Sequence, residues 1–133
     1  MPEPIVYIDR SDIRQGRSEE VKAAARDLVE FIREREPQLL AYGFHFDEDD
    51  TRMTVIAIHP DVASLELHME IGSTAFRRFA ELIDLRTIEV FGDPGDSVLG
   101  RLREKAAGLG DGGSVVVHHQ QAGFARLRVS QER

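Results

Sequence analysis

The chain has 133 residues and 41% hydrophobic content, enough for one domain over residues 1–133 with a core of its own. It has no cysteine, which excludes disulfides, thiolate catalysis and cysteine-ligated metal sites. Its net charge of −7 disfavours nucleic acid and anionic membranes as partners. The N-terminus lacks a basic signal region and no stretch reaches the roughly 18 apolar residues of a membrane span, so we expect a soluble, cytoplasmic protein.

The first predicted elements are a strand and an amphipathic helix. Residues 5–8 (IVYI) are continuously apolar, which predicts a strand buried on both faces. Ser18 is a favourable helix N-cap, and Pro37 ends the helical pattern. Between them the apolar residues recur at helical spacing, as expected of a helix that covers a core: Val21, Ala24, Ala25, Leu28, Phe31 and Ile32.

A β-hairpin is predicted next, from residues 39–46 and 52–58. In the first of these strands Tyr42, Phe44 and Phe46 share one face, and His45 lies on the other. The acidic residues 47–50 join the strands. They lack the glycine and the spaced terminal glutamate of a calcium loop, which favours a solvated turn over a metal site.

The segment from His59 to Asp84 predicts helical structure between two strands. Asp61 is the expected N-cap, and Val62, Leu65 and Met69 form one apolar stripe. Gly72 is expected to interrupt the helix. A second apolar stripe follows it: Ala75, Phe76, Phe79, Leu82 and Ile83. Residues 86–91 (RTIEVF) predict the next strand.

The order of elements over residues 4–92 is β-α-β-β-α-β. This order predicts an α+β, ferredoxin-like fold, in which two helices cover one face of an antiparallel sheet. Apolar residues on both sides of the strands indicate that a second subunit packs against the other face.

Residues 93–133 are a C-terminal extension to that core. Ser97 is the expected cap of a further helix, whose apolar stripe is Val98, Leu99, Leu102, Ala106 and Leu109. Residues 115–119 predict a fifth strand, and residues 123–129 possess the alternation of a sixth. This extension can pair with its own sheet edge or reach onto a partner subunit.

His68 is the first candidate for chemistry. Glu66 and Glu70 mark the wet side of the predicted helix, so His68 points inward. An inward histidine can act as a proton shuttle, a hydrogen-bond anchor, or a metal or haem ligand, because its unperturbed pKa is about 6.5. The alternative is a core histidine that is hydrogen-bonded to a backbone carbonyl.

The remaining histidines and aromatic residues give weaker signals. His59 ends a strand, where sheets often present ligands. His118 and His119 are adjacent, so a strand directs them to opposite faces and they cannot jointly bind one metal. We predict no metal site, and we also predict no cofactor. Aromatic residues of the strands can line a pocket for a planar ligand, although plain core packing is the more common role.

Two features resemble the antibiotic biosynthesis monooxygenase-type family of the dimeric α/β barrel superfamily. They are the element order of residues 4–92 and the segment HPDVASLELHMEIGSTAFRRFAEL. The matching positions are Ser64, His68, Phe76 and Phe79. The resemblance implies a homodimer with a pocket between sheet and helices in each subunit. Activities in this superfamily include cofactor-independent oxygenation of aromatic, polyketide-like substrates and haem degradation. The haem-degrading relatives use a tryptophan and an asparagine, and this chain contains neither.

Two functional hypotheses follow from the residues and the resemblance. In the first, the protein is a cofactor-independent, monooxygenase-like enzyme in which His68 is catalytic. Its substrate-binding residues are then Tyr42, Phe44, His59, Ser64, Phe76 and Phe79. In the second, the protein is a non-catalytic dimeric ligand-binding or accessory protein that uses the same pocket.

Overall fold

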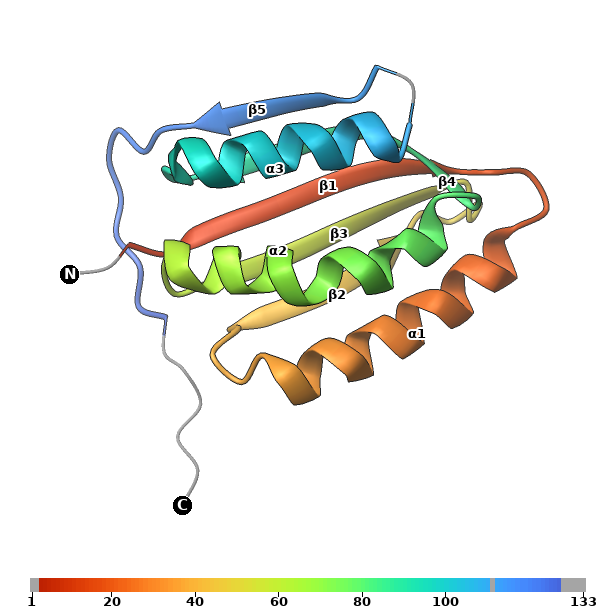
Figure 1. Ribbon diagram of the computed structural model, residues 1–133, viewed down its shortest axis with the longest axis horizontal. Helices are drawn as coiled ribbons and strands as arrows, with labels where there is room; N and C mark the ends of the chain where they lie inside the picture. The colour runs from red at the N-terminus through yellow and green to blue at the C-terminus, as the bar shows by residue number, and fades with distance from the viewer. Residues whose placement is uncertain (1–2, 111, 128–133) are drawn as a thin grey trace.

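The computed structural model describes residues 3–110 and 112–127, which form one five-stranded sheet with helices on one face (Figure 1). The elements in chain order are β1 (Ile5–Ile13), α1 (Ser18–Arg35), β2 (Ala41–Phe46), β3 (Arg52–His59), α2 (Val62–Phe76), the 3₁₀ turn η1 (Arg77–Phe79), β4 (Ile83–Phe91), α3 (Gly95–Gly108) and β5 (Ser114–His118). Within the described residues, no helix is long and apolar enough to cross a bilayer.

The strand order is β2-β3-β1-β4-β5. The first four strands pair antiparallel, which confirms the ferredoxin-like core. β5 adds to the β4 edge in the parallel direction, so the complete sheet is mixed rather than antiparallel. The extension therefore pairs its fifth strand within its own chain.

The central strand β1 places alternate residues under the helices. Tyr7, Asp9 and Ser11 are buried there, whereas Val6 and Ile8 on the opposite face are only partly covered in the single chain. The strand is also longer than the predicted residues 5–8. Its pairing with β4 shifts register between Arg10 and Ser11.

Three local predictions about the helices are wrong, two about N-caps and one about an interruption. Ser18 and Ser97 lie inside α1 and α3, and neither helix has a side-chain hydrogen bond at its N-cap. At α3, the Asp93 carboxylate instead accepts a hydrogen bond from the Gly95 amide at 3.0 Å. Gly72 does not interrupt α2, because the helix continues through it to Phe76.

Two strand boundaries also differ from the predictions. Ile83 begins β4 and is not part of a helical stripe, because the helical region already ends with η1 at Phe79. The predicted sixth strand is absent from residues 119–127, which form no strand and leave Phe124 and Leu127 exposed. The rest of that predicted strand, residues 128 and 129, lies outside the described residues.

Candidate active site

His68 lies on the face of α2 that is turned toward the sheet. The Asp61 carboxylate caps this helix by accepting a hydrogen bond from the Ser64 amide at 2.9 Å, as the sequence predicts. Only 8% of His68 is exposed. The predicted inward orientation is therefore present.

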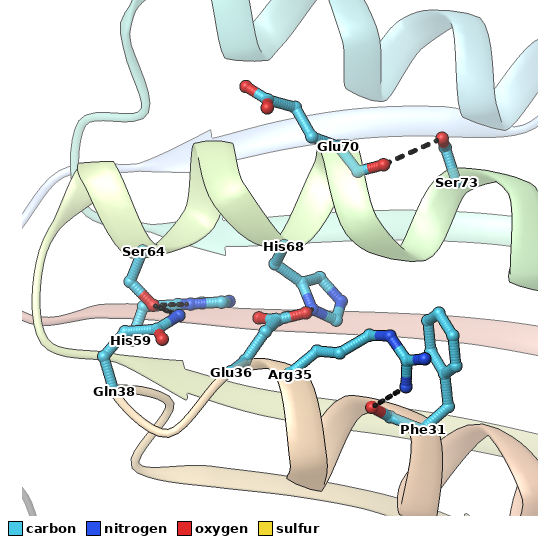
Figure 2. A network of polar contacts seen from close by, with 9 residues as sticks. All are labelled: Phe31, Arg35, Glu36, Gln38, His59, Ser64, His68, Glu70 and Ser73. Carbon is cyan, nitrogen blue, oxygen red and sulfur yellow. Dashed lines mark hydrogen bonds and ion pairs between the residues drawn. The ribbon is translucent and has the colours of Figure 1, made fainter.

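The partner of His68 is a carboxyl group from α1. Glu36 is the residue that ends α1, and its side chain is buried. Its Oε1 and Oε2 atoms lie 3.0 Å and 2.9 Å from His68 Nδ1. Figure 2 shows the carboxyl group of Glu36 facing the imidazole of His68. His68 is thus paired with a charged side chain and not with a backbone carbonyl.

This pairing determines which ring nitrogen is left for chemistry. A carboxylate only accepts hydrogen bonds, so Nδ1 donates its hydrogen to Glu36 and Nε2 of the neutral ring has a lone pair. No hydrogen bond to Nε2 is found among the described residues. A histidine held in one tautomer by a buried carboxylate is suited to accept a proton at its other nitrogen.

A cavity of about 680 Å³ opens beside this pair, with walls from α1, β2, α2, η1 and α3. Its apolar lining residues are Leu28, Met69, Phe76, Ala80 and Leu109, and its charged ones are Glu70, Arg77, Arg101, Glu104 and Lys105. His68 and Tyr42 also line it, with their ring centroids 5.2 Å apart. A concave site that combines apolar walls with polar groups is a form that small-molecule sites take, and this cavity is more polar than most of them.

Tyr42 is the phenol nearest to His68. Burial raises the pKa of its hydroxyl above the ordinary range, and the negative charges of Asp9 and Glu36 raise it further. The Tyr42 side chain therefore stays protonated at neutral pH. It can donate a hydrogen bond but does not act as a base.

His59 forms a second polar group under the same helix. Its Nδ1 lies 2.7 Å from Ser64 Oγ, which also accepts a hydrogen bond from Gln38 at 3.2 Å (Figure 2). Burial lowers the pKa of His59 to about 3, and repulsion from His68 lowers it as well. The two imidazole centroids are 5.5 Å apart, so a neutral His59 adds no charge next to His68.

A third polar cluster reaches the cavity from the opposite wall. Lys105 on α3 has its Nζ 2.6 Å from the Tyr7 hydroxyl and 3.4 Å from Asp9 Oδ2. Tyr7 donates to the same Asp9 oxygen at 2.5 Å. Burial lowers the pKa of Lys105, and the neighbouring charge of Asp9 partly counters this effect. Burial and Asp9 both raise the pKa of Tyr7.

The predicted substrate-binding residues fall into two groups. Tyr42 and Phe76 line the cavity with His68. Phe44 and Phe79 stack on each other behind it, with centroids 5.8 Å apart, and His59 and Ser64 are buried beneath α2. The structure brings these residues into one region, but gives only some of them access to a ligand.

Sequence reasoning missed Glu36, Asp9 and Lys105. Glu36 continues the buried helical stripe of Leu28 and Ile32, and Asp9 continues the buried alternation of Ile5 and Tyr7. A charged residue at a position where the periodicity demands an apolar one was the available signal. Among the described residues, no group of three or more His, Asp or Glu side chains is arranged to hold a metal ion.

Solved structures with the same fold were found by structural comparison. MupZ from Pseudomonas fluorescens superposes with a TM-score of 0.71 at 21% identity, covering 93% of this chain and 95% of that one. SnoaB, a cofactor-independent oxygenase from Streptomyces nogalater, gives a TM-score of 0.58 at 14% identity, with 68% and 93% covered. A Nitrosomonas europaea protein, provisionally named an antibiotic biosynthesis monooxygenase, gives 0.60 at 18% identity, with 70% and 92% covered.

The sequence alone gives no comparable match. No family model matches the chain, and no curated protein matches it. At identities this low, the superpositions establish a common fold but leave the reaction open. The chain has the ferredoxin-like fold of the antibiotic biosynthesis monooxygenase-type structures, as its resemblance to that family predicts.

Proposed function

We propose that the protein is a cofactor-independent, monooxygenase-like enzyme that acts on an aromatic or polyketide-like substrate in the cavity beside His68. The observation that carries this proposal is the His68–Glu36 pair, whose histidine lines a cavity of about 680 Å³ with both apolar and charged walls. The shared fold with SnoaB, a cofactor-independent oxygenase, supports the same class of reaction.

His68 acts as a general base in this proposal. Its Nε2 removes a proton from an activated C–H or phenolic O–H group of the bound substrate, and Glu36 stabilises the imidazolium that results. Before the transfer the neutral imidazole and the Glu36 carboxylate together carry one negative charge, and after it the imidazolium and the carboxylate form a neutral ion pair. This pairing lowers the energy of the protonated His68 in a buried site.

The resulting substrate anion supplies the electrons for reaction with dioxygen. An activated methylene group illustrates the balance: R₂CH₂ and O₂ give R₂C=O and H₂O, with all four electrons coming from the methylene carbon. The carbon–hydrogen bonds break, one oxygen atom enters the substrate, and the other leaves as water. The protein contributes the proton transfer at His68.

Oxygen consumption with a panel of hydroxylated aromatic substrates tests this function. We expect turnover by the wild type and a loss on the order of 10²–10⁴-fold in His68→Ala, the usual contribution of general base catalysis. His119→Ala is the matched control, because His119 is exposed after the end of β5. Equal turnover by wild type and His68→Ala would remove His68 from the mechanism.

The non-catalytic alternative has its own readout. Native mass spectrometry of freshly purified protein reveals any small molecule retained in the cavity. A retained ligand without oxygen consumption across the panel favours a binding protein over an enzyme.

A further inference from the structure

Lys105 is a buried cation that the base chemistry of His68 does not use. It projects from α3 toward α2 and the sheet, where only 15% of its side chain is exposed. Its Nζ lies 4.0 Å from the centroid of the Phe76 ring and borders the cavity that His68 also lines. Burial of a charged lysine costs free energy unless hydrogen bonds and an opposite charge compensate it.

The compensation from Asp9 is incomplete. The ammonium group has three N–H donors, and among the described residues its oxygen partners are Tyr7 at 2.6 Å and Asp9 Oδ2 at 3.4 Å. The second distance is well beyond the roughly 2.7–2.9 Å of a strong charge-assisted hydrogen bond. Asp9 instead receives its short hydrogen bond from the neutral Tyr7 hydroxyl. At least one donor of Lys105 is therefore available to a ligand.

We propose that Lys105 binds the anionic oxygen that the substrate develops when His68 removes its proton. This inference rests on the proposed function, since it assigns a second group that lines the same cavity. His68 takes the proton from carbon or oxygen, the electron pair moves onto the carbonyl or phenol oxygen, and the ammonium group stabilises that oxyanion. The proton stays on His68, so no further reactant is needed for this step.

The arrangement defines a substrate class. The ligand has an apolar body that fits against Leu28, Met69 and Phe76, an acidic hydrogen near His68, and an oxygen near Lys105. Enolisable ketones fused to an aromatic ring and phenols meet all three requirements. Tyr7 and Asp9 hold the lysine in place, because the Asp9 carboxylate accepts hydrogen bonds from the Tyr7 hydroxyl and from the Lys105 ammonium group.

Binding of 4-nitrophenol tests the assignment without any turnover. This phenol ionises near neutral pH and is coloured only as the phenolate, so its absorbance reports the ionised fraction in the site. We expect the wild type to bind the phenolate more tightly than 4-nitroanisole, its neutral methyl ether. Lys105→Met should weaken phenolate binding on the order of 10- to 100-fold and leave 4-nitroanisole binding unchanged. Arg103→Met is the matched control, as Arg103 is an exposed cation on the same helix.

A further variant separates binding from folding, because Lys105→Met leaves the buried Asp9 without its cation. The double variant Asp9→Asn/Lys105→Met removes both charges and should show the same loss of phenolate binding in a folded protein.

The outcomes distinguish this inference from the proposed function. Equal phenolate affinity in wild type and in a folded Lys105→Met or double variant overturns the role of Lys105, whatever the oxygen assay shows. Oxygen consumption that depends on His68 but not on Lys105 overturns it too. If phenolate binding follows the expected pattern but no oxygen is consumed, the role of Lys105 is supported and only the proposed oxygenase function is contradicted.

Discussion

Gly72 lies one helical turn beyond His68, and a Cβ atom on Gly72 would lie 3.9 Å from His68 Nε2. The same atom would lie 3.8 Å from Ile32 Cδ1, an ordinary contact. Because Gly72 lines the cavity, the missing side chain leaves open space beside the nitrogen that we propose as the base.

Gly72→Ala should therefore separate stability from activity. Replacing a glycine within a helix by alanine stabilises a protein by roughly 0.5–1 kcal/mol. A methyl group in the binding space should lower kcat/KM by about tenfold or more. Urea unfolding and oxygen consumption measure the two effects. Gly100→Ala is the control, because Gly100 is also helical and a Cβ there meets nothing within 4 Å. Unchanged kcat/KM in Gly72→Ala would show that substrate does not approach Nε2 from this side.

Glu36→Gln tests the role of the buried carboxyl group. The amide keeps the size of the side chain but removes the charge that stabilises a protonated His68. We expect kcat to fall by at least about tenfold with little change in KM, since Glu36 does not line the cavity. Glu34→Gln is the control, as its side chain is 74% exposed near the same helix end. A change in KM alone would assign Glu36 to the shape of the site and not to proton transfer.

The fold was more accessible to sequence reasoning than the site, for a physical reason. Strand and helix patterns come from many apolar residues, so misplaced caps at Ser18 and Ser97 did not alter the order of elements. The site depends on three charged residues. Asp9 and Glu36 each replace an apolar residue in a buried pattern, and Lys105 lines the cavity from α3.

The partners of those charged residues could not be deduced from local patterns. Glu36 and His68 are 32 positions apart, and Lys105 and Tyr7 are 98 positions apart. Helix and strand periodicity determines which face a side chain occupies, but not which distant side chain it meets. Packing of α1, α2 and α3 on the same sheet face brings them together (Figure 1).

Acid should destabilise the protein through His59. Burial lowers the pKa of His59 from 6.5 to about 3, so the unfolded chain binds the proton first as the pH falls. The free energy of unfolding should then decrease between pH 6.5 and 3, by at most about 1.4 kcal/mol per pH unit from this group. Urea unfolding at a series of pH values measures the slope. His59→Gln should flatten it and His119→Gln should not, whereas identical slopes in all three proteins would contradict a neutral buried His59.

A second copy of the chain should cover the sheet face that the helices leave open. On that face Ile8 lies opposite Ile56 on neighbouring strands, and Phe91 and Val116 are 37% and 43% exposed. The β4 residue opposite Ile8 is Glu89, which ion-pairs with Arg10, so the apolar residues of this face lie beside a polar pair. Exposed apolar patches edged by polar residues mark interaction sites. We expect light scattering to give a homodimer at micromolar concentration, and Ile8→Glu to give a folded monomer, because a charge at the centre of the interface has no partner. Leu67→Glu provides the control, since Leu67 is 37% exposed on α2 and away from this face. A monomeric wild type would contradict the prediction that a second copy of the chain covers the open sheet face.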